Sequence, residues 1–136
     1  MSWETSLVRI ADFEVEELRK RLSAVLERKA MAELSLVMLH AEAESESARG
    51  IDDAEAGWYR IGWLQGWRLR RDRAQAEIAR VEQEEAGARD ALNAAFEDLK
   101  KYEQVADNAK AAKVKKAARL ETAMFDELGL RQALAS

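Results

Sequence analysis

Hydrophobic positions in the first third of the chain follow an alternation of three- and four-residue steps from Val8 to Ala43, interrupted only at Lys29. Five heptads of this spacing are typical of a coiled-coil seam, which a helix cannot bury alone. We therefore predict a first helix over about residues 3–49, capped by Ser2. The predicted seam residues are Val8, Ala11, Val15, Leu18, Leu22, Val25, Lys29, Ala32, Leu36, Leu39 and Ala43.

A second seam of the same kind predicts a second helix over about residues 53–129, with Gly129 as its stop. The alternation loses phase around residues 110–113 and resumes, shifted, at Val114, Ala117, Glu121, Met124 and Leu128. Before that break, the seam residues are Ala74, Ile78, Val81, Glu85, Ala88, Leu92, Ala95, Leu99, Tyr102, Ala106 and Ala109.

Helix-ending and helix-starting signals meet at about residues 50–53. Gly50 readily adopts the positive φ that ends a helix. Asp52, with Glu55 three residues later, resembles a capping box. These signals predict a short turn between the two helices.

The predicted fold class is all-α: one long antiparallel two-helix coiled-coil hairpin that forms a single elongated domain over residues 1–136. The two arms are unequal, because folding about the turn pairs the first residues with about residues 100–105. The last thirty or so residues then have no partner, and a helix of that length is marginal in water. We expect this end either to fray or to enter another molecule.

Composition favours a protein without catalytic chemistry. The chain has no cysteine, one histidine (His40) and no glycine-rich phosphate loop, so we expect no enzyme activity, cofactor or metal. No apolar run is long enough for a membrane span, and the N-terminus has no signal-peptide pattern, so we expect a cytoplasmic protein. The acids Glu82, Glu84, Glu85 and Asp90 are assigned to the solvated helix surface.

An aromatic stretch follows the predicted turn. Tyr59, Trp63 and Trp67 lie at i, i+4 and i+8, which is one stripe of a helix. One interpretation is that they cap the tip of the hairpin. The other is an exposed protein-docking surface, since Trp, Tyr and Arg lead among interface hot spots. Several arginines, Arg70 among them, follow directly, and Gly62 and Gly66 would let a partner approach closely.

A basic run from Lys100 to Arg119 coincides with the phase break. Such a run is usually a solvated helix face, but its position here favours contact with an acidic partner. No aromatic residues interleave with these lysines, and the net charge is −4, so we expect no nucleic-acid partner.

The chain resembles the FliJ family of flagellar type III export proteins over nearly its full length. The resemblance lies in RIADFEVEELRKRL, GIDDAEAGWYRIGWLQGW and FEDLKKYEQVADNAKAAKVKKAARLETAMFDELGLR. It implies a non-enzymatic cytoplasmic coiled coil, peripherally associated with the membrane export apparatus. Such a protein acts as the stalk of the export ATPase ring, contacts the cytoplasmic domain of the export gate and handles export chaperones.

The resemblance also implies where the partners bind. The gate contact would involve exposed apolar positions near the tip, with Met31, Leu34 and Met38 as candidates on the first arm. On the second arm the matching residues are Tyr59, Trp63, Trp67 and Arg70. The ATPase contact would lie in the unpaired end, at Lys113, Val114, Lys116, Met124 and Leu128.

Two other function classes stay open at this point. One is a structural or scaffolding coiled coil from an unrelated system. The other is a nucleic-acid-associated helical hairpin that uses the lysines of the second arm, for which phosphate contacts would give a steep salt dependence of binding.

Overall fold

The computed structural model describes residues 2–49 and 54–135, and the side chains from residue 57 onward in the second range. It consists of two helices, α1 (Trp3–Ala48) and α2 (Ala54–Ala135), with no strand in the described residues. The all-α two-helix hairpin is therefore confirmed. The predicted turn at residues 50–53, with Gly50 and the Asp52 cap, lies outside the described residues.

The start of α1 is capped as predicted. The Ser2 hydroxyl accepts a hydrogen bond from the Thr5 backbone N–H at 3.4 Å, and the Ser6 N–H donates to the Ser2 carbonyl at 3.2 Å. Glu4 lies in the first turn, where the positive end of the helix dipole favours a carboxylate.

The predicted end of the second helix at Gly129 is wrong, because α2 continues to Ala135. A glycine inside a helix costs only about 1 kcal/mol relative to alanine, which its neighbours can offset. Glu127 and Arg131 straddle the glycine one helical turn apart, and their side chains form an ion pair at 2.8 Å. No proline follows to force the helix to stop.

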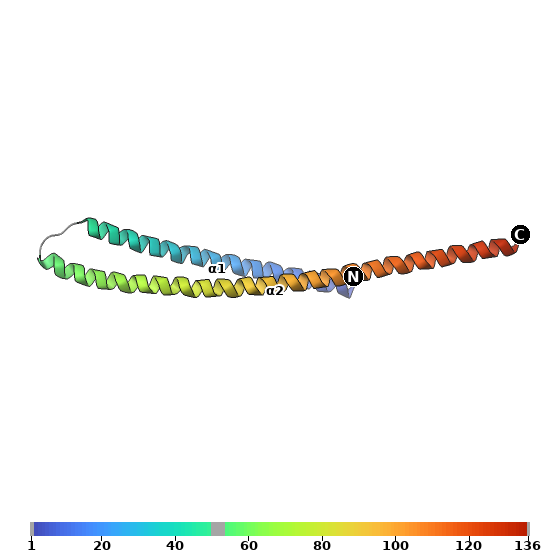
Figure 1. Cartoon of the computed structure of the whole chain (residues 1–136), viewed down its shortest axis with the longest axis horizontal. Helices are drawn as coiled ribbons and strands as arrows, with labels where there is room; N and C mark the ends of the chain where they lie inside the picture. The colour runs from blue at the N-terminus through green and yellow to red at the C-terminus, as the bar shows by residue number, and fades with distance from the viewer. Residues whose placement is uncertain (1, 50–53, 136) are drawn as a thin grey trace. The chain divides into compact units, whose positions relative to one another are not determined.

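Contacts divide the chain into two compact units. One comprises Met1–Glu16 and Ala94–Ser136, and the other Glu17–Asn93. In each unit a segment of α1 lies beside a segment of α2 (Figure 1). The buried apolar residues of the first unit are Ala11, Val15, Ala95 and Leu99; those of the second are Val25, Leu39, Trp67, Val81 and Ala88.

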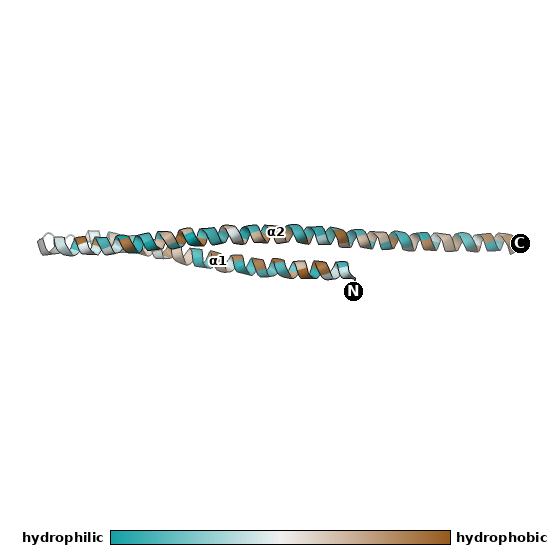
Figure 2. Cartoon of the chain, turned by 90° about the horizontal axis from the view of Figure 1, so that it is seen from below, coloured by the Kyte–Doolittle hydropathy of each residue, from teal (hydrophilic) through white to brown (hydrophobic). Residues whose placement is uncertain are grey.

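The two seams form these cores. Every predicted seam residue from Val8 to Ala43, and every one from Ala74 to Ala109, is buried or half-buried. Side chains between the seam positions are mostly exposed, so polar residues occupy much of the helix surface (Figure 2). This arrangement is the expected result of a 3-4 alternation on two facing helices.

The end of α2 has no partner within the described part of its unit. Ser2, Glu4 and Thr5 lie beside Ala106–Lys113, so the first turn of α1 meets α2 a few residues later than predicted. Every described side chain from residue 111 to residue 135 is exposed, including the resumed alternation from Val114 to Leu128. We call residues 111–135 the overhang; it is the orange-to-red end of α2 in Figure 1.

Candidate protein-docking surfaces

Trp67 is a core residue rather than part of an exposed stripe. Only 8% of it is exposed, and its indole Nε1–H donates a hydrogen bond to the Leu39 carbonyl oxygen at 2.7 Å. The ring also meets the His40 imidazole edge-on, with centroids 5.6 Å apart. The interpretation of Trp67 as part of an exposed docking surface is therefore wrong.

The position of Trp67 on the helix explains its burial. It precedes the seam residue Ala74 by seven residues, two helical turns, and so shares its face. The seam of α2 thus begins at Trp67 at the latest, seven residues before Ala74, the first seam residue that the alternation predicts.

One arginine of α2 lies over this indole, and a second binds α1 nearby. The Arg71 guanidinium lies 5.5 Å from the centre of the indole, within the range of a cation–π interaction. Arg70 forms two hydrogen bonds with the Glu42 carboxylate, at 2.9 and 3.2 Å. This forked geometry fixes the side chain of Arg70 against α1.

The aromatic residues nearer the start of α2 are exposed. Trp58 is 80% exposed and Tyr59 58%, and Ile61 and Leu64 are exposed as well, whereas Trp63 is half-buried. We call Trp58, Tyr59, Ile61 and Leu64 the tip surface. Neighbouring large apolar side chains exposed in this way mark interaction sites more often than scattered ones do.

A groove of about 390 Å³ adjoins the tip surface, between the last turns of α1 and the first turns of α2. One of its lining residues, Glu46, is only 9% exposed, and its Oε2 lies 3.5 Å from Nη1 of Arg49. The lining residues are Ala43, Glu46, Ser47, Arg60, Ile61, Trp63 and Leu64.

The first-arm candidates lie on the surface of α1. Met31, Leu34 and Met38 are each more than half exposed. They occur at steps of three and four residues, which places them on one side of the helix. Leu26, an apolar residue off the seam, is exposed as well, and so is Val37, which sequence reasoning did not single out.

Ion pairs join the two arms in the middle of the Glu17–Asn93 unit. Lys29 Nζ donates to Glu85 Oε1 at 2.8 Å, and Arg28 pairs with Glu84. The assignment to the solvated surface is therefore wrong for Glu85, whose side chain is mostly buried against α1, whereas the Arg28–Glu84 pair is partly exposed. Because Glu85 lies at a seam position, its side chain points toward the other helix. Glu82 and Asp90 are exposed, as assigned.

These contacts shift the pKa values of the paired groups. The hydrogen bond from Lys29, followed by that from Arg89, lowers the pKa of Glu85 below its ordinary value. The hydrogen bond from Arg28 lowers the pKa of Glu84 in the same way. The pKa of Lys29 is raised, first of all by its bond to Glu85.

The overhang carries all five residues that the resemblance assigns to the ATPase. Val114, Met124 and Leu128 are each more than half exposed, and Lys113 and Lys116 are exposed too. The overhang also exposes Leu120, Phe125, Leu130 and Leu134, which sequence reasoning did not assign to a site.

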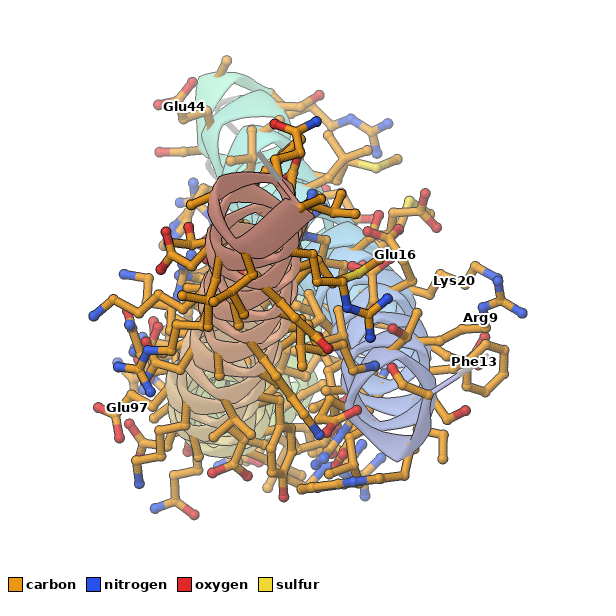
Figure 3. The ribbon with its side chains drawn as sticks, turned by 90° about the vertical axis from the view of Figure 1, so that its right-hand side faces the viewer. Arg9, Phe13, Glu16, Lys20, Glu44 and Glu97 are labelled. Atoms are coloured by element: carbon orange, nitrogen blue, oxygen red, sulfur yellow. The ribbon has the colours of Figure 1, made fainter. Side chains whose placement is uncertain are left out.

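A smaller exposed apolar surface lies on α1, in the segment Met1–Glu16 that belongs to the same unit as the overhang. Trp3, Ile10 and Phe13 are each about two-thirds exposed. The Phe13 side chain projects away from α2, beside that of Arg9 (Figure 3).

The described residues contain neither a metal site nor a membrane span. In residues 2–49 and 54–135 there is no group of three or more carboxylate or imidazole side chains placed to hold a metal ion. No described helix has the length and apolar character needed to cross a membrane.

Comparison with known proteins places this helical pair in a family. The chain is 49% identical over 131 residues, 96% of its length, to the flagellar FliJ protein of Caulobacter vibrioides strain NA1000 / CB15N. The protein of the same name from strain ATCC 19089 / CIP 103742 / CB 15 has the same identity, and 94% of each relative is covered. The chain belongs to the FliJ family.

Two other comparisons found no match. No family model matches the chain, and no solved structure matches it. The match leaves only about five residues of the chain outside it, so it covers most of the overhang.

Proposed function

We propose that this FliJ-family chain is a non-enzymatic cytoplasmic component of flagellar protein export, associated peripherally with the membrane export apparatus. In this role it is the central stalk of the export ATPase ring and links the ring to the export gate and to export chaperones. Kinship with flagellar FliJ proteins supports the export role. The observation that carries the stalk role is the overhang, whose described side chains are all exposed.

The overhang suits insertion into another molecule. At about 1.5 Å per residue, its helix is roughly 38 Å long. Helices without tertiary packing are marginal in water, so a partner that covers Met124 and Leu128 would stabilise this one. Lys113 and Lys116 at its base would attract an acidic opening and guide the helix into it.

The tip surface suits the export gate. Tyr59 and Trp58 are accessible large aromatic side chains, the type that contributes most to interface energy. Half-buried Trp63 lines the adjoining groove, which could receive a side chain of the partner. Trp67 and Arg70 do not face the partner in this arrangement. Their polar groups form hydrogen bonds with α1 and so hold the start of α2 against it.

The exposed side of α1 provides a further contact. Met31, Leu34 and Met38 lie in the same unit as the tip surface, and methionine adapts to partners of different shape. This surface therefore suits either the first-arm part of the gate contact or the export chaperones.

Stimulation of the purified export ATPase tests the stalk role. The variant Met124→Asp with Leu128→Asp should lose most of the stimulation, because two carboxylates replace apolar contacts in the ring. The matched control is Phe13→Asp, which changes an equally exposed apolar residue outside the overhang. Full stimulation by the overhang variant would contradict the stalk role.

A truncation complements the point variants. Removing residues 114–136 leaves every half-buried seam residue of both helices in place. We expect the truncated chain to stay helical and to stimulate no ATPase activity. Stimulation at the level of the full chain would show that another part of the molecule contacts the ring.

Binding to the cytoplasmic domain of the gate tests the tip surface. Trp58→Ala with Tyr59→Ala should raise Kd by about 30-fold, which corresponds to a hot-spot loss of about 2 kcal/mol. The control, Trp3→Ala, removes an exposed indole from the other unit and should leave Kd unchanged. An unaltered Kd for the tip variant would place the gate contact elsewhere.

A further inference from the structure

Charges on the overhang and the residue before it are segregated along the helix. Lys110, Lys113, Lys115, Lys116 and Arg119 come first, the acids Glu121, Asp126 and Glu127 follow, and one further cation, Arg131, lies beyond them. Within the described part of the chain, only Glu127 and Arg131 among these residues form an ion pair. The segment thus has a basic half and an acidic half with few internal partners.

An apolar stripe runs between the charges. It consists of Ala117, Leu120, Met124 and Leu128, all exposed, at steps of three, four and four residues. At 100° per residue these positions lie on one side of the helix. The seam residue Ala106 precedes Ala117 by eleven residues, and Leu128 follows it by eleven, a spacing that favours a right-handed supercoil rather than the left-handed one of a 3-4 alternation.

We propose that the overhangs of two copies of this chain pair antiparallel, about a two-fold axis close to Leu120. Antiparallel pairing brings Lys116 of one copy toward Glu127 of the other, since both flank the stripe, whereas Lys115, Arg119 and Asp126 lie on the far side of the helix. A parallel pair would instead set like charges side by side. The charges of this segment complement those of the same segment in the reverse direction. The partner that covers the stripe is therefore a second copy of the chain.

The register follows from the positions of the charges. With the axis midway between Leu120 and Glu121, Ala117 faces Met124 of the second copy, so a small residue meets a large one. Lys113 and Lys116 then come within reach of Glu127 of the second copy. The axis repeats each contact, because an interface of this symmetry is built from the same patch twice.

Pairing covers residues that the proposed function assigns to the ATPase, among them Met124 and Leu128. The dimer would therefore be a form in which the overhang is masked until a partner displaces the second copy. The inference does not rest on the ATPase role, because both its tests use the purified full-length chain alone.

Sedimentation velocity over a range of concentrations at low salt tests the pairing. The natural chain should dimerise, and Lys116→Glu or Glu127→Lys alone should raise the dimer dissociation constant about tenfold, since each change affects two symmetry-related contacts. The double variant Lys116→Glu, Glu127→Lys should regain association. Glu97→Lys, the same change at an exposed site outside the overhang, should have no effect.

Cross-linking tests the orientation. The chain has no cysteine, so Leu120→Cys and Leu134→Cys each introduce a single thiol at an exposed site. Oxidation should link Leu120→Cys into dimers. It should not link Leu134→Cys, because antiparallel pairing separates the two thiols by about 40 Å.

Three results would overturn the proposal. A chain that is monomeric at every concentration forms no such pair. A dimer that is indifferent to both charge reversals uses another surface. Cross-linking of Leu134→Cys as readily as of Leu120→Cys would show a parallel arrangement.

Discussion

Lys29 and Glu85 are the charged interruptions of two otherwise uncharged seams, and they meet: Lys29 Nζ lies 2.8 Å from Glu85 Oε1. Glu85 also accepts a hydrogen bond from Arg89 on its own helix at 2.9 Å. A shift of one helix along the other would leave each charge against apolar side chains, which is unfavourable. The pair therefore favours one register of the two arms over its neighbours.

The Lys29–Glu85 pair predicts an acid-sensitive hairpin. The pKa of Glu85 is held below its ordinary value of 4.5, so its contribution to stability is present above pH 4.5 and disappears as the pH falls through the lower folded-state pKa. We expect the melting temperature, followed by circular dichroism, to stay level from pH 7 to about pH 5 and to drop below about pH 4.5.

Glu85→Gln isolates this effect. The variant should melt at a lower temperature at pH 7 and show a smaller drop in acid, because it has no carboxylate to protonate at this position. Glu97→Gln, at an exposed site, is the control and should follow the natural chain. Parallel acid profiles for Glu85→Gln and the natural chain would mean that the pair adds no stability.

Burial predicts different costs for one substitution at two sites. Val81 is fully buried in the seam, whereas Val114 lies exposed on the overhang. Val81→Ala should destabilise the chain by roughly 2 kcal/mol, through lost contacts and a small cavity. Val114→Ala should change stability by less than about 0.5 kcal/mol. Denaturant unfolding measures both, and equal costs would contradict the burial of the seam.

Much of this fold follows from periodicity alone. Val15, Val25 and Val81 fall in the core because a 3-4 alternation defines one face of a helix, and a hairpin has only one facing helix to cover it. The continuation past Gly129 could not be predicted in this way. It depends on the balance between the cost of one glycine and local side-chain pairs such as Glu127–Arg131.

The docking surfaces are less predictable from the sequence than the core. The spacing of Tyr59, Trp63 and Trp67 indicates one stripe, but the stripe passes from solvent at Tyr59 into the seam at Trp67 as the arms come together. The point at which the stripe enters the seam depends on where α1 ends. The spacing of the aromatic residues on α2 gives no information about the end of α1. The hydrogen bond from Trp67 to the Leu39 carbonyl likewise links residues 28 positions apart.

The tryptophans near the tip should therefore differ sharply in their effect on stability. Trp67→Ala should destabilise the hairpin by about 3 kcal/mol or more, as expected for a buried indole. Trp67→Phe keeps most of the packing and should cost about 1 kcal/mol for the lost hydrogen bond to Leu39. Trp58→Ala should change stability by less than about 0.5 kcal/mol. Thermal and denaturant unfolding separate these cases, and a mild Trp67→Ala would contradict its burial.

Glycines beside the tryptophans offer a test that separates stability from binding. Gly62 and Gly66 lie within α2, and a methyl group built on either meets no atom within 4 Å, so alanine fits at both. Alanine loses less backbone freedom than glycine when a helix forms, so each Gly→Ala change should stabilise the chain by about 0.5 to 1 kcal/mol. Gly87→Ala, equally open but farther along α2, should stabilise it to the same extent.

If the partner's backbone approaches the helix at Gly62 and Gly66, Gly62→Ala with Gly66→Ala should weaken gate binding, whereas Gly87→Ala should not. Titration of the gate domain with each variant measures this difference. Unchanged binding by a stabilised Gly62→Ala, Gly66→Ala chain would show that the glycines are not needed for close approach, and the contact would then rest on the aromatic side chains alone.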